Sequence, residues 1–174
     1  DDPKERLQMW SGRSGLVPAF SRYKPGSRLI PIAEDFGVPP SRIPEAIKGI
    51  QEIAKRNDIT IATFGHVGDG NLHSTFITDV RRKDEWGKIR TVGNELIELA
   101  VKLGGTVTAE HGTGRSKAPF IRREMGAALD VMATIKKALD PENILNPGKM
   151  GLFEKKAAGG SPPARARTRR ACSC

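Results

Sequence analysis

The histidines of this chain lie in two glycine-rich segments, and there are only three of them in 174 residues. His66 and His73 enclose the stretch VGDGNL, while His111 directly follows Glu110 in AEHGTG. Imidazole and carboxylate groups are common ligands of divalent metal ions, and histidine also serves as a general base near neutral pH. Two imidazoles and one carboxylate leave coordination positions open, which is typical of a catalytic metal site rather than a structural one.

The elements predicted around the first segment would bring His66 and His73 together. Residues 59–66 are β-branched and apolar, and residues 72–78 alternate between apolar and polar, so both are predicted to be strands of one hairpin. The glycines between them allow the positive φ angles that a tight turn requires. Such a hairpin places both imidazoles at the same end of the sheet, within reach of a single ion.

A further strand predicted over 106–109 leads into the corner that carries Glu110 and His111. In the predicted sheet this strand lies close to the hairpin, so its corner could deliver a carboxylate and a third imidazole to the same place. Successive residues of an extended segment point to opposite sides. Glu110 can therefore be a metal ligand while His111 faces another group.

The wider hydrophobic pattern predicts an α+β fold. Apolar residues at helical spacing predict helices, and apolar runs bounded by glycine or proline predict strands. The predicted helices cover residues 5–23, 41–57, 84–103 and 129–139, and the predicted strands cover 29–38, 59–66, 72–78 and 106–109. From residue 29 the order is βαββαβ, as in a ferredoxin-like antiparallel sheet with helices packed on one face, and further helices flank it at both ends. Leu7 and Trp10 of the first helix are expected to point inward.

The formal charge of +9 is concentrated in the last part of the chain. Six lysines and arginines follow Glu154, and removing six charges from +9 leaves +3 on residues 1–154, so no nucleic-acid binding is expected of the domain. Residues 155–174 have no large apolar side chain and are predicted to be a disordered basic tail; contact with nucleic acid or an anionic membrane is the weaker alternative. No run of about 18 apolar residues occurs, so no transmembrane segment is predicted.

Other chemistries that use glycine loops do not match the sequence. The phosphate-binding pattern GxxxxGK[ST] and the serine-hydrolase pattern GxSxG are absent, and GHVGDG does not match the dinucleotide fingerprint GxGxxG. From the residues alone, two interpretations stay open besides redox chemistry. One is hydrolysis at the metal, and the other is a stand-alone ferredoxin-like metal-binding module without redox activity.

Four segments resemble one known family. GHVGDGNLH, AEHGTGRSK, ALDPENILNPGK and EDFGVPPSRIPEAI are similar, in consistent order, to the C-terminal part of FAD-linked 2-hydroxy acid dehydrogenases. That family includes glycolate oxidase, D-lactate dehydrogenase and D-2-hydroxyglutarate dehydrogenase, and the resemblance covers about residues 8–151. It implies that residues 1–154 are the C-terminal domain of such an enzyme without its FAD-binding domain, and that they turn over little or nothing alone. The absence of an initiating Met is also expected of a chain that begins inside a longer gene product.

The resemblance implies roles for the residues of the two glycine-rich segments. His66, His73 and Glu110 correspond to ligands of a divalent ion, commonly zinc. His111 corresponds to the residue that removes the proton from the substrate hydroxyl, while a hydride passes from C2 of the acid to the flavin. The implied reaction is the FAD-dependent oxidation of a D-2-hydroxy acid, of the glycolate or D-lactate type, to the 2-oxo acid.

Three further residues receive roles from the resemblance. Arg13 falls where family members bind the substrate carboxylate, Thr75 falls at a position that contacts substrate, and Asn146 in LNPGK falls where the chain runs close to the flavin. Because the hydroxyglutarate enzyme has an asparagine where this chain has Thr75, that substrate is not assigned. The resemblance also suggests an electron acceptor or iron–sulfur partner subunit, and a location in the cytoplasm or peripheral to the inner membrane.

Overall fold

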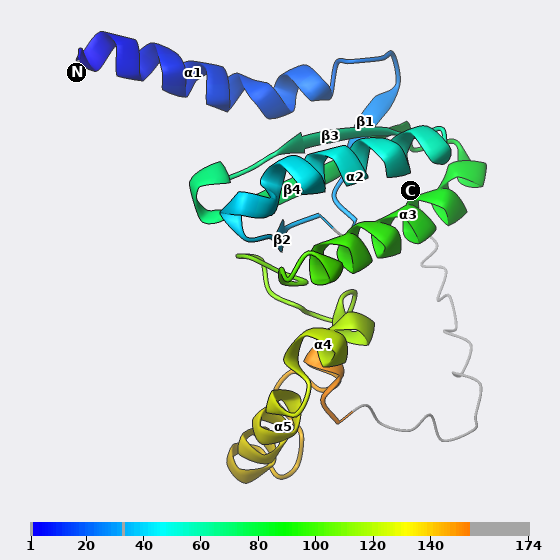
Figure 1. Ribbon diagram of the computed structural model, residues 1–174. Helices are drawn as coiled ribbons and strands as arrows, with labels where there is room; N and C mark the ends of the chain where they lie inside the picture. Colours follow the sequence, from blue (N-terminus) through cyan, green and yellow to red (C-terminus); the bar gives the residue numbers. More distant parts are fainter. Residues whose placement is uncertain (1, 33, 154–174) are drawn as a thin grey trace, which may run out of the picture.

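A small antiparallel sheet lies at the centre of the computed structural model, which describes residues 2–32 and 34–153 (Figure 1). The long strand β4 (Asn71–Asp79) pairs with β1 (Ser27–Ile30), β2 (Phe36–Gly37) and β3 (Thr60–Phe64). Strands β1 and β3 both pair with residues 76 and 77 of β4 and therefore lie on its opposite edges, while β2 pairs with its first two residues. The predicted hairpin is thus confirmed.

Two amphipathic helices cover one face of this sheet (Figure 1). Helices α2 (Ile43–Arg56) and α3 (Lys83–Lys102) bury their apolar faces against Leu72 and Phe76 of β4, and together these residues form the main hydrophobic core. Because side chains alternate along a strand, the odd-numbered residues of β4 point to the other face. The predicted α+β class is confirmed, with helices α2 and α3 on one face of the sheet.

The first helix behaves differently from the prediction. Helix α1 (Pro3–Phe20) extends away from the sheet, with the N-terminus at its far tip (Figure 1), and it buries none of its residues. Leu7 and Trp10, which were expected to point inward, are 72% and 56% exposed. The reason is that only the C-terminal half of the helix lies near the sheet, where Phe20 stacks on Phe64 with ring centroids 6.1 Å apart.

The C-terminal part forms a second, smaller cluster. Helix α4 (Ala118–Met125), which the sequence did not predict, packs with α5 (Ala128–Leu139) against the far side of α3. This cluster buries Phe120, Ile121 and Leu129. A short 3₁₀ turn, η3 (Lys149–Gly151), closes it. The predicted basic tail over 155–174 lies outside the described residues.

Two predicted strands are shorter than expected. The predicted strand over 29–38 is interrupted between β1 and β2, where Asp35 takes a positive φ of 66°. The predicted strand over 106–109 is reduced to a single bridge between Gly37 and Thr106. The backbone N–H of Val107 donates to Glu124 and that of Ala109 donates to Asp35, so neither is available to pair with a neighbouring strand.

Candidate functional site

Three imidazoles converge on one carboxylate at the end of the sheet where the β3–β4 hairpin turns. Oε1 of Glu110 lies 2.9 Å from Nε2 of His73, 3.7 Å from Nε2 of His66 and 3.8 Å from Nε2 of His111. Ligand atoms of His66, His73 and Glu110 all lie within 4.8 Å of one another, a separation that allows them to share a metal ion after small side-chain adjustments. The structure therefore brings together the four candidate residues of the two glycine-rich segments: His66, His73, Glu110 and His111.

The hairpin positions its two histidines through a turn that requires glycine. Strand β3 ends opposite His73, and η2 (Val67–Asp69) follows His66. The chain then reverses at Gly70, which has a φ of 77°. A Cβ at this position would lie 1.9 Å from the carbonyl oxygen of Val38, so only glycine fits here. After the turn, the side chain of His73 lies on the face of the sheet that is opposite to α2 and α3.

Asp35 fixes the corner that carries Glu110 and His111. Its carboxylate is fully buried and accepts hydrogen bonds from the backbone N–H groups of both residues, at 3.0 and 2.9 Å, and from the Thr108 hydroxyl at 2.6 Å. It also accepts one from the Asn71 amide at 3.0 Å, which ties the corner to the start of β4. This role was not predicted from the sequence. The available signal was a charged residue inside the apolar run 29–38.

A buried lysine completes this anchor. Nζ of Lys117 lies 3.4 Å from Oδ2 of Asp35 and also donates to the backbone carbonyl of Asp35. Burial raises the pKa of Asp35, but the hydrogen bonds from Thr108 and from the backbone of His111 and Glu110, together with the charge of Lys117, outweigh burial and hold this pKa well below its usual range. Burial lowers the pKa of Lys117, and Asp35 opposes that shift.

A second carboxylate contacts two of the imidazoles. Oε2 of Glu34 lies 2.8 Å from Nδ1 of His73, and Oε1 of the same side chain lies 2.8 Å from Nδ1 of His111. The two rings stack with centroids 5.2 Å apart and an interplanar angle of 29°. Glu34 was not predicted either, although it stands next to Asp35 in the segment EDFGVPP.

A cavity of about 380 Å³ opens beside the histidines. Arg13, Leu16 and Val17 of α1 line it together with Phe64, Gly65, His66, His73 and Glu110. Arg13 therefore lies at the same site as the candidate metal ligands, although it is 53 residues away from the nearest of them in sequence. Its guanidinium stacks over the ring of Trp10, 5.3 Å from the ring centroid.

The other two predicted site residues lie apart from this cavity. Thr75 is buried on the same face of β4 as His73, two residues further along, and does not contribute to the cavity lining. Asn146 is exposed, has a φ of 48° and belongs to the segment that leads into η3, so the described residues do not bring it to the histidines. Met150, four residues later, donates from its backbone N–H to the carbonyl of Gly114, three residues after His111.

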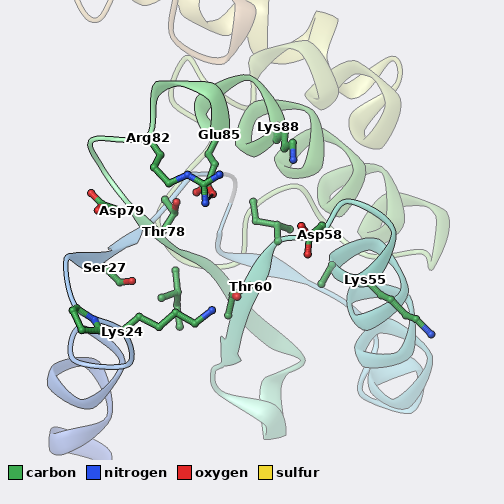
Figure 2. Close-up of a pocket in the computed structure, with 14 residues that line it drawn as sticks. Lys24, Ser27, Lys55, Asp58, Thr60, Thr78, Asp79, Arg82, Glu85 and Lys88 are labelled. Atoms are coloured by element: carbon green, nitrogen blue, oxygen red, sulfur yellow. Dashed lines mark ion pairs between the residues drawn. The ribbon is translucent and has the colours of Figure 1, made fainter.

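A larger cavity, of about 500 Å³, lies toward the opposite end of β4 (Figure 2). Four cationic and three anionic side chains line it: Lys24, Lys55, Arg82 and Lys88 together with Asp58, Asp79 and Glu85. Two of these, Arg82 and Glu85, form an ion pair at 2.6 Å. The cavity contains none of the predicted site residues, and its charges largely compensate one another within its own lining. We therefore take the histidine cluster as the candidate site.

No helix in the described ranges 2–32 and 34–153 combines the length and the apolar character needed to cross a bilayer. Comparison with known proteins gives a consistent result over most of the chain. The family defined as FAD linked oxidases, C-terminal domain, matches residues 1–150. Glycolate oxidase subunit GlcD of Bacillus subtilis is 45% identical over 148 residues, which cover 84% of this chain and 31% of that protein.

Two further relatives carry related names. The probable mitochondrial D-lactate dehydrogenase of Danio rerio is 35% identical over 86% of this chain and 30% of its own length. The D-2-hydroxyglutarate dehydrogenase of Stutzerimonas stutzeri is 36% identical over 84% of this chain and 32% of its own length. The chain thus spans about a third of the length of the curated relatives it matches.

Proposed function

Because the chain belongs to the family of FAD linked oxidases by its C-terminal domain, we propose that it supplies the metal- and substrate-binding part of an enzyme that oxidises a small D-2-hydroxy acid, of the glycolate or D-lactate type, to the 2-oxo acid. The observation that carries this proposal is the convergence of three Nε2 atoms on Glu110 beside a cavity lined by Arg13. The names of the relatives support the substrate class.

The donor atoms of the cluster fit a divalent metal ion. Two imidazole nitrogens and a carboxylate oxygen are the donor set of an open zinc site, and the ligand atoms of His66, His73 and Glu110 are close enough to share one ion. When bound, such an ion, zinc in our proposal, would act as a Lewis acid on the oxygens of the acid. His111 is not a member of this ligand group, because its ligand atom groups with those of Glu34 and His73 instead.

The chain's own residues would bind the acid and move its proton. The guanidinium of Arg13 suits the substrate carboxylate, because its planar donors match the two carboxylate oxygens. His111 is 52% exposed at its side chain and borders the same cluster, so its Nε2 can accept the proton of the substrate hydroxyl as a general base. In the proposal, Thr75 supports the substrate region from the buried face of β4, and Asn146 faces the flavin.

FAD supplies the hydride-accepting chemistry of the family. We assign residues 1–154 to the metal- and substrate-binding domain and assign most of the flavin contacts to a separate domain, for which the additional length of the relatives leaves room. The disordered basic tail over 155–174, the electron acceptor or iron–sulfur partner subunit, and the location in the cytoplasm or at the inner membrane stay predictions.

The metal part of the proposal is tested on the full chain. Zinc titration of the metal-free protein by calorimetry should give one site, and Co²⁺ should give the visible absorption of a nitrogen- and oxygen-ligated ion. Replacing His66 by Ala should weaken zinc binding by more than the roughly 10–100-fold that is typical of outer-shell partners. His111→Ala is the matched control and should retain zinc. Equal losses in both variants would contradict the ligand assignment.

The redox part is tested in a chimera in which residues 1–153 replace the matching third of the Bacillus subtilis protein. Reduction of a dye is measured with glycolate, D-lactate and D-2-hydroxyglutarate. His111→Ala in this chimera should lower kcat by about 10²- to 10⁴-fold without loss of zinc, because general-base catalysis contributes on that scale. An active chimera that is indifferent to this substitution would refute the assigned base.

A further inference from the structure

Glu34 lies between a candidate metal ligand and the candidate base, and each of its oxygens contacts one of them. Oε2 is 2.8 Å from Nδ1 of His73, and Oε1 is 2.8 Å from Nδ1 of His111. The Glu34 side chain is only 14% exposed, so water competes weakly for these hydrogen bonds. The stacked arrangement of the two rings allows one carboxylate to reach both Nδ1 atoms.

We propose that Glu34 is a shared positioning residue that keeps a proton on Nδ1 of both His73 and His111. An ionised carboxylate can only accept hydrogen bonds, so each Nδ1 must be the donor in its contact. A neutral imidazole that is protonated at Nδ1 has its lone pair on Nε2. Nε2 of each ring is therefore the nitrogen left for a metal ion or a substrate. Any proton that Nε2 of His73 shares with Glu110, 2.9 Å away, would be displaced by the ion.

This inference rests on the proposed function, which assigns His73 to the metal and His111 to the substrate, but the contacts of Glu34 with both rings involve no ligand. For His73, the arrangement is the one in which a metal-binding histidine donates its other ring N–H to a carboxylate, which fixes the tautomer and the orientation of the ring. For His111, the same contact leaves Nε2 as a proton acceptor. A single carboxylate would thus prepare one histidine for the metal and the other for the substrate.

The backbone around Glu34 explains how its side chain is held in place. The next residue, Asp35, has a φ of 66° and a fully buried carboxylate that binds the backbone of Glu110 and His111. Asp35 therefore joins the segment of Glu34 to the corner that carries His111. Asn71 binds the same carboxylate two residues before His73. Both imidazoles are thereby placed at fixed positions relative to Glu34.

The first test needs no substitution. Long-range ¹H–¹⁵N spectra of the full chain, uniformly labelled with ¹⁵N and free of metal, report for each ring which nitrogen carries a proton. We expect a proton-bearing Nδ1 on both His73 and His111, and His66, whose contact is with Glu110, serves as an internal reference. A deprotonated Nδ1 on either ring would overturn the proposal. After zinc is added, an Nδ1-coordinated His73 would overturn it as well, since Glu34, His73 and His111 would then be the ligand group.

The second test uses Glu34→Gln, which keeps the shape of the side chain but offers one acceptor and one donor. At least one of His73 and His111 should then lose its Nδ1 proton, and zinc affinity should fall by about 10–100-fold. Glu45→Gln, at an exposed position in α2, is the matched control and should change neither property. Unchanged ring protonation in Glu34→Gln would refute the positioning role. If the wild-type chain bound no zinc, the proposed metal site would fail, while the spectra of the metal-free chain would still decide the role of Glu34.

Discussion

Replacing Asp35 by Asn is expected to destabilise the protein by about 3–5 kcal/mol, because it removes the counter-charge of a buried lysine. The carboxylate is fully buried, and Lys117 is 5% exposed. Asn keeps one acceptor oxygen but turns the other position into a donor that faces existing donors. On Oδ1 these donors are the Asn71 amide and the Glu110 backbone, and on Oδ2 they include the Thr108 hydroxyl and two backbone N–H groups.

The magnitude follows from two overlapping effects. A hydrogen bond to a charged group contributes about 1.5–3 kcal/mol, and at least two such bonds to Asp35 lose their acceptor in the variant. Breaking a buried ion pair by removing one partner costs about 3–5 kcal/mol on its own. Because both effects concern the same charge they do not add, and the larger one sets the estimate. Domains are stable by about 5–15 kcal/mol, so most of the variant should still fold.

Urea unfolding followed by far-UV circular dichroism measures this loss as a lower midpoint at unchanged m. Asp84→Asn, which removes an exposed ion pair with Arg82, is the control and should change stability by about 0.5 kcal/mol or less. Adding Lys117→Met to Asp35→Asn should recover part of the loss, because the unpaired charge is gone. A loss below about 1 kcal/mol in Asp35→Asn, or no recovery in the double variant, would refute the reasoning.

Two further predictions concern the rest of the sheet. Hydrogen bonds and charge from Arg81 hold the pKa of Asp79 at about 2. The contribution of this carboxylate to stability is therefore complete above pH 4 and is lost as the pH falls toward 2. Arg81→Gln should move the midpoint of the Asp79 carboxyl toward 3.8 in a ¹³C NMR titration, and an unmoved midpoint would contradict the assignment. Gly70→Ala should destabilise by more than about 1 kcal/mol, because its Cβ would collide with the Val38 carbonyl at a φ of 77°. Thermal unfolding of both variants checks this: Gly68→Ala, whose Cβ would meet open space, should have a melting temperature close to that of the wild type.

The parts of the fold that sequence could predict are those controlled by local patterns. The hairpin follows from alternation and glycine, and helix α3 follows from apolar residues every three or four positions. The meeting of His66 and His73 needed only these local features, since a short turn separates them. By contrast, the apolar residues of helix α1 are not gathered on one side of the helix, and the helix buries none of its residues. The prediction that Leu7 and Trp10 point inward gave too little weight to this missing apolar face.

The anchors of the site were beyond local patterns for a different reason. Asp35 and Glu34 act through hydrogen bonds to residues more than 70 positions later in the chain. In the sequence they interrupt an apolar run and look like an exposed position of a strand. The corner over 106–109 was predicted to be a strand because its composition allows one. The backbone N–H groups of Val107 and Ala109 instead donate to the carboxylates of Glu124 and Asp35, so no strand ladder forms there. Asp35 also binds the next two N–H groups and thereby fixes Glu110 and His111.

The alternation of β4 makes the stability of the fold and the geometry of the site depend on one register. Leu72 and Phe76 enter the core beneath α2 and α3, so His73 and Thr75 must point to the opposite face. A shift of one residue would move Leu72 and Phe76 to the face of the histidine site and would place the imidazole of His73 against the apolar helices. The loss of apolar packing against α2 and α3 therefore disfavours that register. Since Gly70 sets where β4 begins, the packing of the hydrophobic core also sets the position of His73, the proposed metal ligand.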